Sequence, residues 1–379
     1  MQTFHHAHFK DSRDMRAIAT ASVELVVTSP PYPMIEMWDE GFGALSAAVR
    51  KALKRHDGRT AFDLMHGILD AVWKEAFRIL KPGGFACINI GDAARTIGAD
   101  FMLYPNHARI LSCLLELGFT PLPAILWRKQ TNAPNKFMGS GMYPAGAYVT
   151  LEHEYILIVR KGGKREFDSE EEKQRRRESA IFWEERNAWY SDVWMELKGA
   201  RQDLRQKDTR SRSGAFPFEL AYRLISMFSA KGDTVVDPFL GTGTTLKAAA
   251  AAGRNSIGYE IEPAFRRDIF SDPAGVAALA RRRVRARIDD HLAFVEERRA
   301  AGREIKYQNR HYGFPVVTRQ EMDLRLDILE GLTPGEDRDN LMATYADDPC
   351  RILDPERVSP ESRSPVANGQ LSLWNCAEK

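Results

Sequence analysis

A glycine turn between a short strand and a helix is the feature that most constrains how this chain can fold. Residues 234–237 (Thr-Val-Val-Asp) are a β-branched run typical of a buried strand, and residues 244–252 are typical of a helix. Gly241 and Gly243 lie in the turn between them, where the lack of a Cβ lets the backbone approach a ligand closely. The next predicted strand ends at Glu260. This alternation of strands and helices predicts an α/β fold with a mostly parallel sheet.

The turn favours a nucleoside ligand without phosphate groups. A dinucleotide fingerprint needs a third glycine, but Leu246 stands at that position. A phosphate-binding P-loop needs lysine after its glycine, but Gly243 is followed by Thr244. The Glu260 carboxylate can accept hydrogen bonds from both hydroxyls of a ribose. S-adenosylmethionine fits this pattern, and the alternative is a purely structural turn.

A second turn has the chemistry to hold an amine. Ser29, Pro30, Pro31 and Tyr32 follow the β-branched run at residues 23–27, at the carboxyl end of a predicted parallel strand, where α/β folds bind ligands. The prolines fix the backbone so that the Pro30 carbonyl points outward as an acceptor, and the Ser29 hydroxyl is a second acceptor. Tyr32 offers a flat face on which a base can stack. Two acceptors and a ring suit the exocyclic amine of a base, although a proline-capped turn with a packed tyrosine is the plainer alternative.

Further elements support the alternation. The sequence predicts the following strands and helices: strands at 85–90, 123–127 and 155–159, and helices at 61–80, 104–117, 217–228 and 276–299. Residues 81–84 (Lys-Pro-Gly-Gly) are expected to end the first of these helices.

The two turns together resemble the DNA amino-methyltransferases, which make N4-methylcytosine or N6-methyladenine. Residues 28–32 (Thr-Ser-Pro-Pro-Tyr) resemble the catalytic motif of that family, and residues 236–245 resemble its cofactor motif. Four further segments are similar to family segments: 80–84, 127–129, 216–220 and 258–260. The resemblance implies a class I S-adenosylmethionine-dependent methyltransferase sandwich, which is Rossmann-like. The catalytic motif comes first in the chain, as in the circularly permuted β group of the family.

The resemblance also assigns roles to residues. It implies that Ser29, Pro30, Pro31 and Tyr32 are catalytic. It implies that the cofactor is held by the following residues: Phe216, Pro217, Asp237, Pro238, Phe239, Gly241, Gly243, Thr244 and Glu260. Asp11 follows the first predicted strand and is expected to face the methionine end of the cofactor.

The order of motifs predicts four regions. Residues 1–160 would form the catalytic half and residues 215–300 the cofactor-binding half of one methyltransferase domain. Residues 161–214 are charged and irregular and would form an inserted target-recognition module. Residues 301–379 would be an accessory region whose tail, beyond Asp347, is disordered. Contact with double-stranded DNA is expected from basic residues in the insertion: Arg201, Arg205, Lys207, Arg210 and Arg212.

Composition sets broad limits. The 379 residues carry a formal net charge of only +2, so a DNA-binding surface must be local. The basic stretch 281–287 is either a solvated helix face or a phosphate contact. Four scattered cysteines, and histidines without an acidic cluster, predict no metal site. The absence of a signal peptide and of a long apolar run predicts a cytoplasmic protein that does not contact a membrane.

Several functions stay open at this point. The favoured interpretation is transfer of a methyl group from S-adenosylmethionine to the N4 amine of a flipped cytosine, because the related N6-adenine enzymes more often carry aspartate at the position of Ser29. An N6-adenine enzyme is the first alternative, followed by an RNA or small-molecule methyltransferase and by a non-catalytic DNA-binding protein. Whether a cognate restriction endonuclease accompanies the protein stays open.

Overall fold

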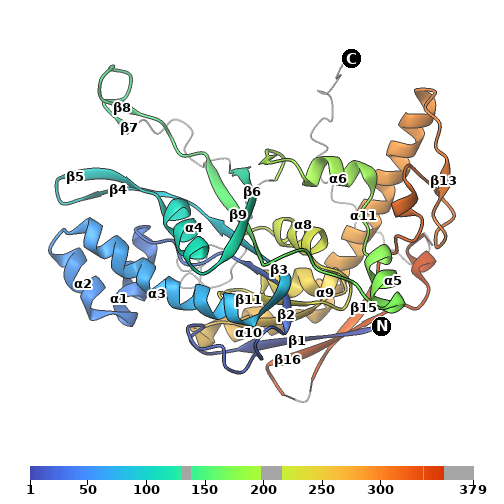
Figure 1. Ribbon diagram of the computed structural model, residues 1–379, viewed down its shortest axis with the longest axis horizontal. Helices are drawn as coiled ribbons and strands as arrows, with labels where there is room; N and C mark the ends of the chain where they lie inside the picture. Colours follow the sequence, from blue (N-terminus) through green and yellow to red (C-terminus); the bar gives the residue numbers. More distant parts are fainter. Residues whose placement is uncertain (130–137, 198–215, 336, 354–379) are drawn as a thin grey trace.

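The centre of the molecule is a ten-stranded mixed sheet (Figure 1). A computed structural model describes residues 1–129, 138–197, 216–335 and 337–353. The strands lie in this order: β10 (Val193–Trp194), β6 (Phe119–Arg128), β9 (His153–Lys161), β3 (Leu80–Ile90), β2 (Val23–Thr28), β11 (Thr234–Asp237), β12 (Asn255–Tyr259), β1 (Gln2–His8), β16 (Asn340–Tyr345) and β15 (Leu329–Pro334). The strands from β3 to β1 are all parallel. Their carboxyl ends therefore meet along one edge, where α/β sheets place their ligand sites.

Helices cover both faces of this sheet. One face carries α3 (Gly58–Ile79) and α4 (Asn106–Glu116), and the other carries α8 (Phe218–Phe228), α9 (Thr244–Ala251) and the start of α11 (Pro273–Ala300). The strand β2 shows why two layers form. Leu25 and Val27 pack into the core with α8 and α9, whereas Val26 packs into the core with α3, because successive side chains of a strand point to opposite faces. The α/β sandwich predicted from the sequence is confirmed.

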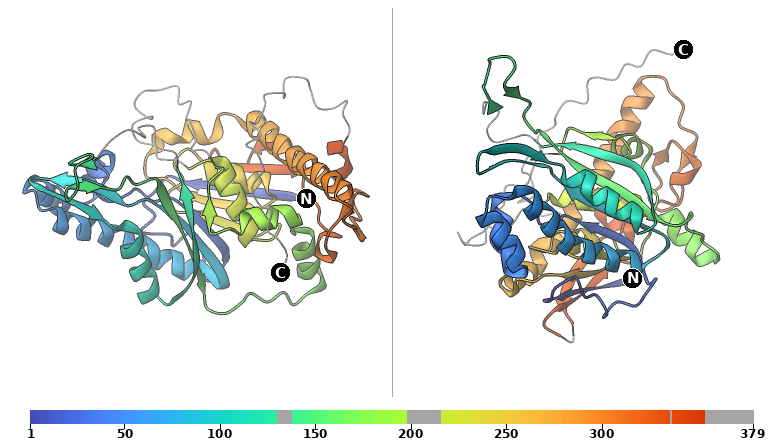
Figure 2. Two further views of the ribbon diagram at one scale, coloured as in Figure 1. Left: turned by 90° about the horizontal axis from the view of Figure 1, so that it is seen from above. Right: turned by 60° about the vertical axis from the view of Figure 1, so that its left-hand side comes forward.

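Additional elements stand beyond the carboxyl edge of the sheet. They are α1 (Asp39–Leu45), α2 (Ala47–Lys54), the hairpin β4–β5 (Ala93–Ile97 and Asp100–Tyr104) and the hairpin β7–β8 (Met138–Gly139 and Ala147–Tyr148). The two hairpins touch where the rings of Phe101 and Tyr148 stack with centroids 4.8 Å apart. The α2 end and the α11 end lie at opposite ends of the molecule (Figure 2).

Most predicted elements are present, with two differences. The helix α3 ends just before residues 81–84, as predicted, but these residues already belong to the strand β3, which begins at Leu80. Its pairing with β2 shifts register between Val23 and Leu25, and Gly83 adopts φ +82°, which accommodates this irregular start. The strand β9 is antiparallel to both of its neighbours, which alternating periodicity alone does not reveal.

The described part of the insertion is well ordered into elements. Residues 161–197 include α5 (Glu170–Glu178), which Ser169 and Glu172 cap reciprocally, and α6 (Trp183–Trp189). The strand β10 then adds an edge to the central sheet by pairing with β6. The aromatic residues of this segment are divided between two cores. Trp189 and Trp194 join the main core, and Phe182 joins a cluster with α11.

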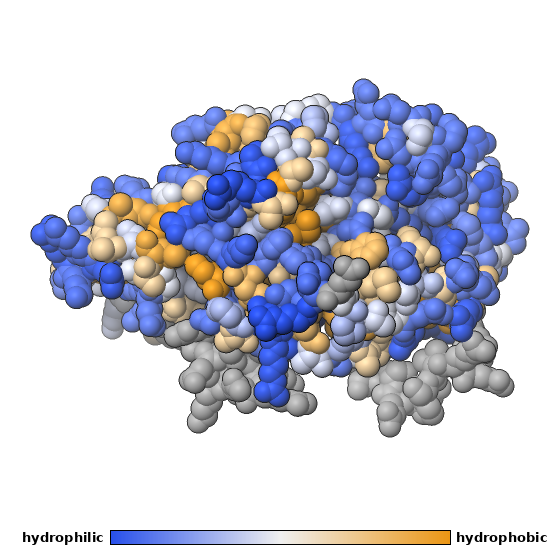
Figure 3. Space-filling view, turned by 90° about the horizontal axis from the view of Figure 1, so that it is seen from below, coloured by the Kyte–Doolittle hydropathy of each residue, from blue (hydrophilic) through white to orange (hydrophobic). Residues whose placement is uncertain are grey.

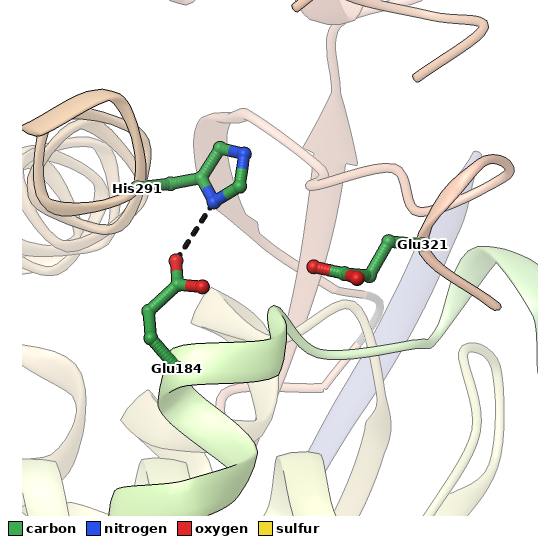
Figure 4. Close-up of side chains that lie close together, drawn as sticks. All are labelled: Glu184, His291 and Glu321. Carbon is green, nitrogen blue, oxygen red and sulfur yellow. Dashed lines mark hydrogen bonds and ion pairs between the residues drawn. The ribbon is translucent and has the colours of Figure 1, made fainter. Parts of the chain in front are cut away.

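A buried ion pair fastens α6 to α11. His291 Nδ1 lies 2.7 Å from a Glu184 oxygen, and its Nε2 donates to the Pro315 carbonyl at 2.9 Å (Figure 4). The Glu321 carboxylate completes the group and accepts the backbone N–H of Trp183 at 2.9 Å. Burial opposes the charged imidazole, but hydrogen bonding to Glu184 outweighs this effect and raises the pKa of His291. Both ring nitrogens face oxygen acceptors, so this contact favours the protonated ring.

The carboxyl-terminal region extends the same sheet. The strand β16 pairs with β1, and β15 pairs with β16. The short hairpin β13–β14 (Tyr307–Gln308 and Pro315–Val316) packs near α11, and residues 349–353 form a 3-10 helix, so the tail expected beyond Asp347 starts with ordered structure. Within the described residues, no helix combines the length and the apolar character needed to cross a membrane.

Candidate active site

A cavity of about 430 Å³ opens at the carboxyl edge of the parallel strands. Ten predicted site residues line it: Asp11, Ser29, Pro31, Phe216, Asp237, Pro238, Phe239, Gly241, Thr244 and Glu260. Apolar side chains form most of the remaining wall, including Leu45 of α1 as well as Ile261 and Phe265 after β12. Figure 3 shows apolar residues gathered on the lower face of the molecule, towards the end where α1 and α2 lie. The structure thus brings both predicted turns to one cavity.

The two glycines of the turn have different roles. Gly241 has φ +52°, and a Cβ added there would meet nothing within 4 Å, so the cavity is open at this point. Gly243 has φ +81° and begins α9, but a Cβ there would lie 3.3 Å from the side chain of Ile269. Close approach to a ligand was predicted for both glycines. The geometry supports it for Gly241, whereas Gly243 is needed for backbone conformation and packing.

The Glu260 carboxylate holds the glycine turn in place through hydrogen bonds to the backbone. One oxygen of its carboxylate accepts the N–H of Gly241, and the other accepts the N–H of Glu262, each at 2.8 Å. Burial raises the pKa of Glu260, although these two hydrogen bonds favour the charged form. Each oxygen retains a lone pair, so the carboxylate can still accept hydroxyl groups from a ligand in the cavity.

Asp237 connects the two turns. Its carboxylate accepts the Thr28 hydroxyl at 2.6 Å, the Thr245 hydroxyl at 2.5 Å and the N–H of Phe239 at 3.0 Å. Burial raises the pKa of Asp237 to about 6. Because three protein donors surround it, Asp237 is better placed to hold Thr28, and therefore the start of the Ser-Pro-Pro-Tyr turn, than to contact a cofactor itself.

The Tyr32 hydroxyl lies in a polar cluster behind the Ser-Pro-Pro-Tyr turn. It donates to Glu154 at 2.9 Å and accepts from Asn89 at 2.8 Å and from Ser29 at 3.2 Å. Burial and the charge of Glu154 raise the pKa of Tyr32 well above its ordinary value, so the phenol stays neutral. Because the Ser29 hydroxyl donates its hydrogen bond to Tyr32, the lone pairs of the Ser29 oxygen are free to accept an amine N–H.

Three residues of this cluster were not predicted as site residues. Asn89 donates to both Tyr32 and Glu154, and Lys129 forms an ion pair with Glu154 at 2.8 Å. The available signal was a charged residue, Glu154, at an inward position of a strand whose other inward residues are apolar. Lys129 belonged to a segment noted only for its family likeness.

The remaining predicted residues have mixed outcomes. Burial favours the neutral form of Asp11, but hydrogen bonds from Arg13 hold its pKa below the ordinary value, and both residues line the cavity. Phe216 reaches the cavity, whereas Pro217 precedes α8 as its N-cap. Pro30 is buried in the turn and, with Tyr32, does not line the cavity wall.

The basic residues considered as DNA contacts fall into two groups. Arg201, Arg205, Lys207, Arg210 and Arg212 lie outside the described residues. The arginines at 281–287 in α11 are mostly engaged inside the protein: Arg283 pairs with Glu219, and the fully buried Arg287 pairs with Glu185. Arg285 pairs with Asp289. Most of this stretch therefore holds helices together, and only Arg282 in it is exposed.

Comparisons with known proteins cover both turns. A family described as DNA methylase matches residues 23–271. The chain is 53% identical over 327 residues to the Type II methyltransferase M.MthZI of Methanothermobacter thermautotrophicus, covering 86% of this chain and 91% of that protein. It is 48% identical over 285 residues to the Type II methyltransferase M.MjaI of Methanocaldococcus jannaschii, covering 72% and 92%. A solved DNA modification methylase of Thermus thermophilus, complexed with S-adenosyl-L-methionine, shares 34% identity and a TM-score of 0.55, covering 70% of this chain and 92% of that one.

Proposed function

Because the chain belongs to the N6/N4 DNA methylase family, we propose that it methylates the exocyclic N4 amine of cytosine in DNA with S-adenosylmethionine. The observation that carries this proposal is the position of Ser29, which lines the cavity and is hydrogen-bonded to Tyr32 behind it. Ser29 donates to the tyrosine and keeps acceptor lone pairs for an amine. Membership of the family rests on the matches above, and we propose in addition the target base and the roles of the residues.

The residues present fit the cofactor. The cavity is open beside Gly241, carries the Glu260 carboxylate and is otherwise largely apolar. A nucleoside without phosphates needs such a site, with acceptors for the ribose and apolar walls for the adenine. Glu260 and the Gly241 backbone would hold the ribose end, and Asp11 and Phe216 would lie at other parts of the wall.

The proposed mechanism relies on positioning. S-adenosylmethionine supplies an electrophilic methyl group bonded to a sulfonium. The lone pair of the cytosine amine is delocalised into the ring, so Ser29 and the Pro30 carbonyl would accept its two N–H groups and favour a tetrahedral nitrogen. These contacts strengthen as the transition state forms and therefore raise the rate. The released proton leaves to water, because the methylated amine cation is strongly acidic.

Two observations support the amine of cytosine as the target. Methylation at cytosine C5 needs a thiolate nucleophile. No cysteine from the described part of the chain lines the cavity, and burial raises the pKa of Cys87 far above its ordinary value. A neutral serine at the head of the turn resembles the cytosine branch of the family more than the adenine branch.

The chain order supports a permuted arrangement. The strand β2, which carries the catalytic turn, precedes β11 by about 200 residues in sequence and yet lies next to it in the sheet. We propose that the catalytic half and the cofactor half have exchanged places along the chain relative to unpermuted relatives.

Mass spectrometry of nucleosides from DNA treated with the protein and S-adenosylmethionine tests the proposed product. N4-methylcytosine is expected, and the Ser29→Ala variant should form much less of it while still binding the cofactor. N6-methyladenine alone would overturn the base and keep the enzyme class. Finding 5-methylcytosine would overturn the mechanism, and finding no methylated nucleoside would overturn the proposed activity.

A further inference from the structure

Five exposed basic side chains gather where α2 meets α3. The helix α2 buries Val49 and Ala52 against the protein and turns its opposite face to solvent. We call the following residues the basic corner: Arg50, Lys51, Lys54, Arg55 and Arg59. Residues 50–59 hold these five cations and one acid, Asp57, which gives 5 − 1 = +4. The Asp57 carboxylate already accepts the N–H of Thr60 as the cap of α3.

The cations of the basic corner are not neutralised within the protein. Across the described residues, none of the five side chains forms an ion pair or a side-chain hydrogen bond. Neighbouring arginines differ: Arg95 pairs with Asp39, and Arg109 pairs with Asp70. In α11, Arg283 and Arg287 are likewise paired. A local field of uncompensated positive charge attracts a polyanion.

The basic corner lies beside the candidate active site. The helix α1 lines the cavity with residues such as Phe42 and Leu45, and α2 packs on α1. A Cβ added at Gly43 would lie 2.6 Å from Cγ of Arg50, so the stem of this arginine lies directly on α1. On its other side, the corner is next to the β4–β5 hairpin, because a Cβ at Gly98 would lie 3.1 Å from Cβ of His56, which follows Arg55. Figure 3 shows that this end of the molecule is strongly hydrophilic next to the apolar patch.

We propose that the basic corner binds backbone phosphates of duplex DNA next to the target base. The inference rests on the proposed function, because it takes DNA as the substrate. A base that enters the cavity leaves its flanking phosphates outside it, and α2 packs on α1, which lines the cavity. Lysine and arginine side chains on an exposed helix face suit phosphate oxygens, which such side chains bind without reading the sequence.

A charge-neutralised triple variant tests the inference. Lys51→Gln, Lys54→Gln and Arg55→Gln change exposed side chains only, so the fold and cofactor binding should persist. The matched control is Arg282→Gln, Arg299→Gln and Arg303→Gln, which removes three exposed cations near the opposite end of the molecule. Fluorescence anisotropy with a labelled mixed-sequence duplex gives the affinity of each protein between about 50 and 200 mM salt.

The corner variant should bind DNA at least about tenfold more weakly than the wild type at about 100 mM salt. The magnitude of its slope of log affinity against log salt should fall by about 0.9 for each phosphate that the protein no longer neutralises. The preference among DNA sequences should not change, since phosphate binding carries no base information. An unchanged affinity and slope, or an equal loss of affinity in the control, would overturn the inference. Methyl transfer is measured separately, so a wild-type protein that binds DNA through the corner but methylates no base would refute only the proposed function.

Discussion

At the residue scale, the hydroxyl of Tyr32 is as important as its ring. Stacking alone would let Tyr32→Phe keep most activity. However, this hydroxyl joins Ser29, Asn89 and Glu154, and its loss would remove the acceptor of Ser29 and one partner each of Asn89 and Glu154. We therefore expect Tyr32→Phe to lower kcat by roughly tenfold or more, with little change in cofactor affinity. Steady-state kinetics and calorimetry check this, with the exposed Tyr148→Phe as the control.

A substitution of Glu154 tests the same polar cluster through the partner of the Tyr32 hydroxyl. In Glu154→Gln the side chain keeps its size but loses the charge that Lys129 faces at 2.8 Å. Turnover should fall while the melting temperature changes little, because Lys129 can turn to solvent. If Glu154→Gln and Tyr32→Phe act through one network, the double variant should be no slower than the slower single variant. Additive losses would show that Glu154 acts independently of Tyr32.

Glu260 is the residue on which we expect cofactor affinity to depend most. Glu260→Ala removes the acceptor for the ribose and also releases the N–H of Gly241. The affinity for S-adenosylmethionine should fall by about 1.5–3 kcal/mol, a range typical of hydrogen bonds to charged groups. Calorimetry measures this, and Glu297→Gln on α11 serves as the control. An unchanged affinity in folded Glu260→Ala protein would contradict the assignment.

At the scale of elements, Asp237 makes activity depend on pH by joining β11 to the end of β2. Burial raises its pKa to about 6, so the charged form that accepts the Thr28 hydroxyl is lost as the pH falls through that value. The folded pKa lies above the unfolded value, so protonation in this range does not destabilise the fold. We expect kcat to fall below about pH 6 without unfolding. Asp237→Asn should be slow at neutral pH and should lack this pH step.

The contact between α6 and α11 gives a second pH dependence, in stability. Burial opposes the charge, but Glu184 raises the pKa of His291, so its ion pair stabilises the fold fully below the unfolded pKa of about 6.5. This contribution is lost as the pH rises through the folded pKa. The melting temperature of the wild type should therefore decrease over that range, and His291→Gln should remove this part of the decrease. A parallel pH profile in the variant would contradict the role of His291.

Elements with strong local signals could be predicted from the sequence. The strand at residues 234–237 and the helix after Gly243 were predicted within one residue, because a β-branched run and a glycine turn define them locally. The antiparallel direction of β9 and the pairing of β10 with β6 could not be predicted, since both depend on which distant strands are neighbours. The buried pairing of the α11 arginines was missed for the same reason.

At the scale of the whole molecule, the candidate site was predictable where it follows contiguous motifs. Ser29, Gly241 and Glu260 lie in such motifs and line one cavity. Asn89, Lys129 and Glu154 come from three different strands or strand ends and meet only in the folded chain. The link between Thr28 and Asp237 joins residues more than 200 positions apart. Periodicity describes each strand but not its neighbours, which explains this division.

The choice of DNA site for methylation is a property of the whole molecule, because it depends on a surface outside the cavity. Residues 161–214 were proposed as the recognition module, but residues 161–197 contribute an edge strand, buried aromatic side chains and the α6–α11 ion pair. Replacing all of them would disturb the fold. The sharper experiment exchanges residues 198–214, which contain the five predicted basic contacts, for the corresponding segment of a related enzyme with another specificity. Sequencing of the methylated DNA should show the donor's site, with cofactor affinity unchanged. If the original site persists, recognition lies elsewhere, and the β7–β8 hairpin is the first candidate, because it stands beyond the carboxyl edge of the sheet and exposes Met142 and Tyr143.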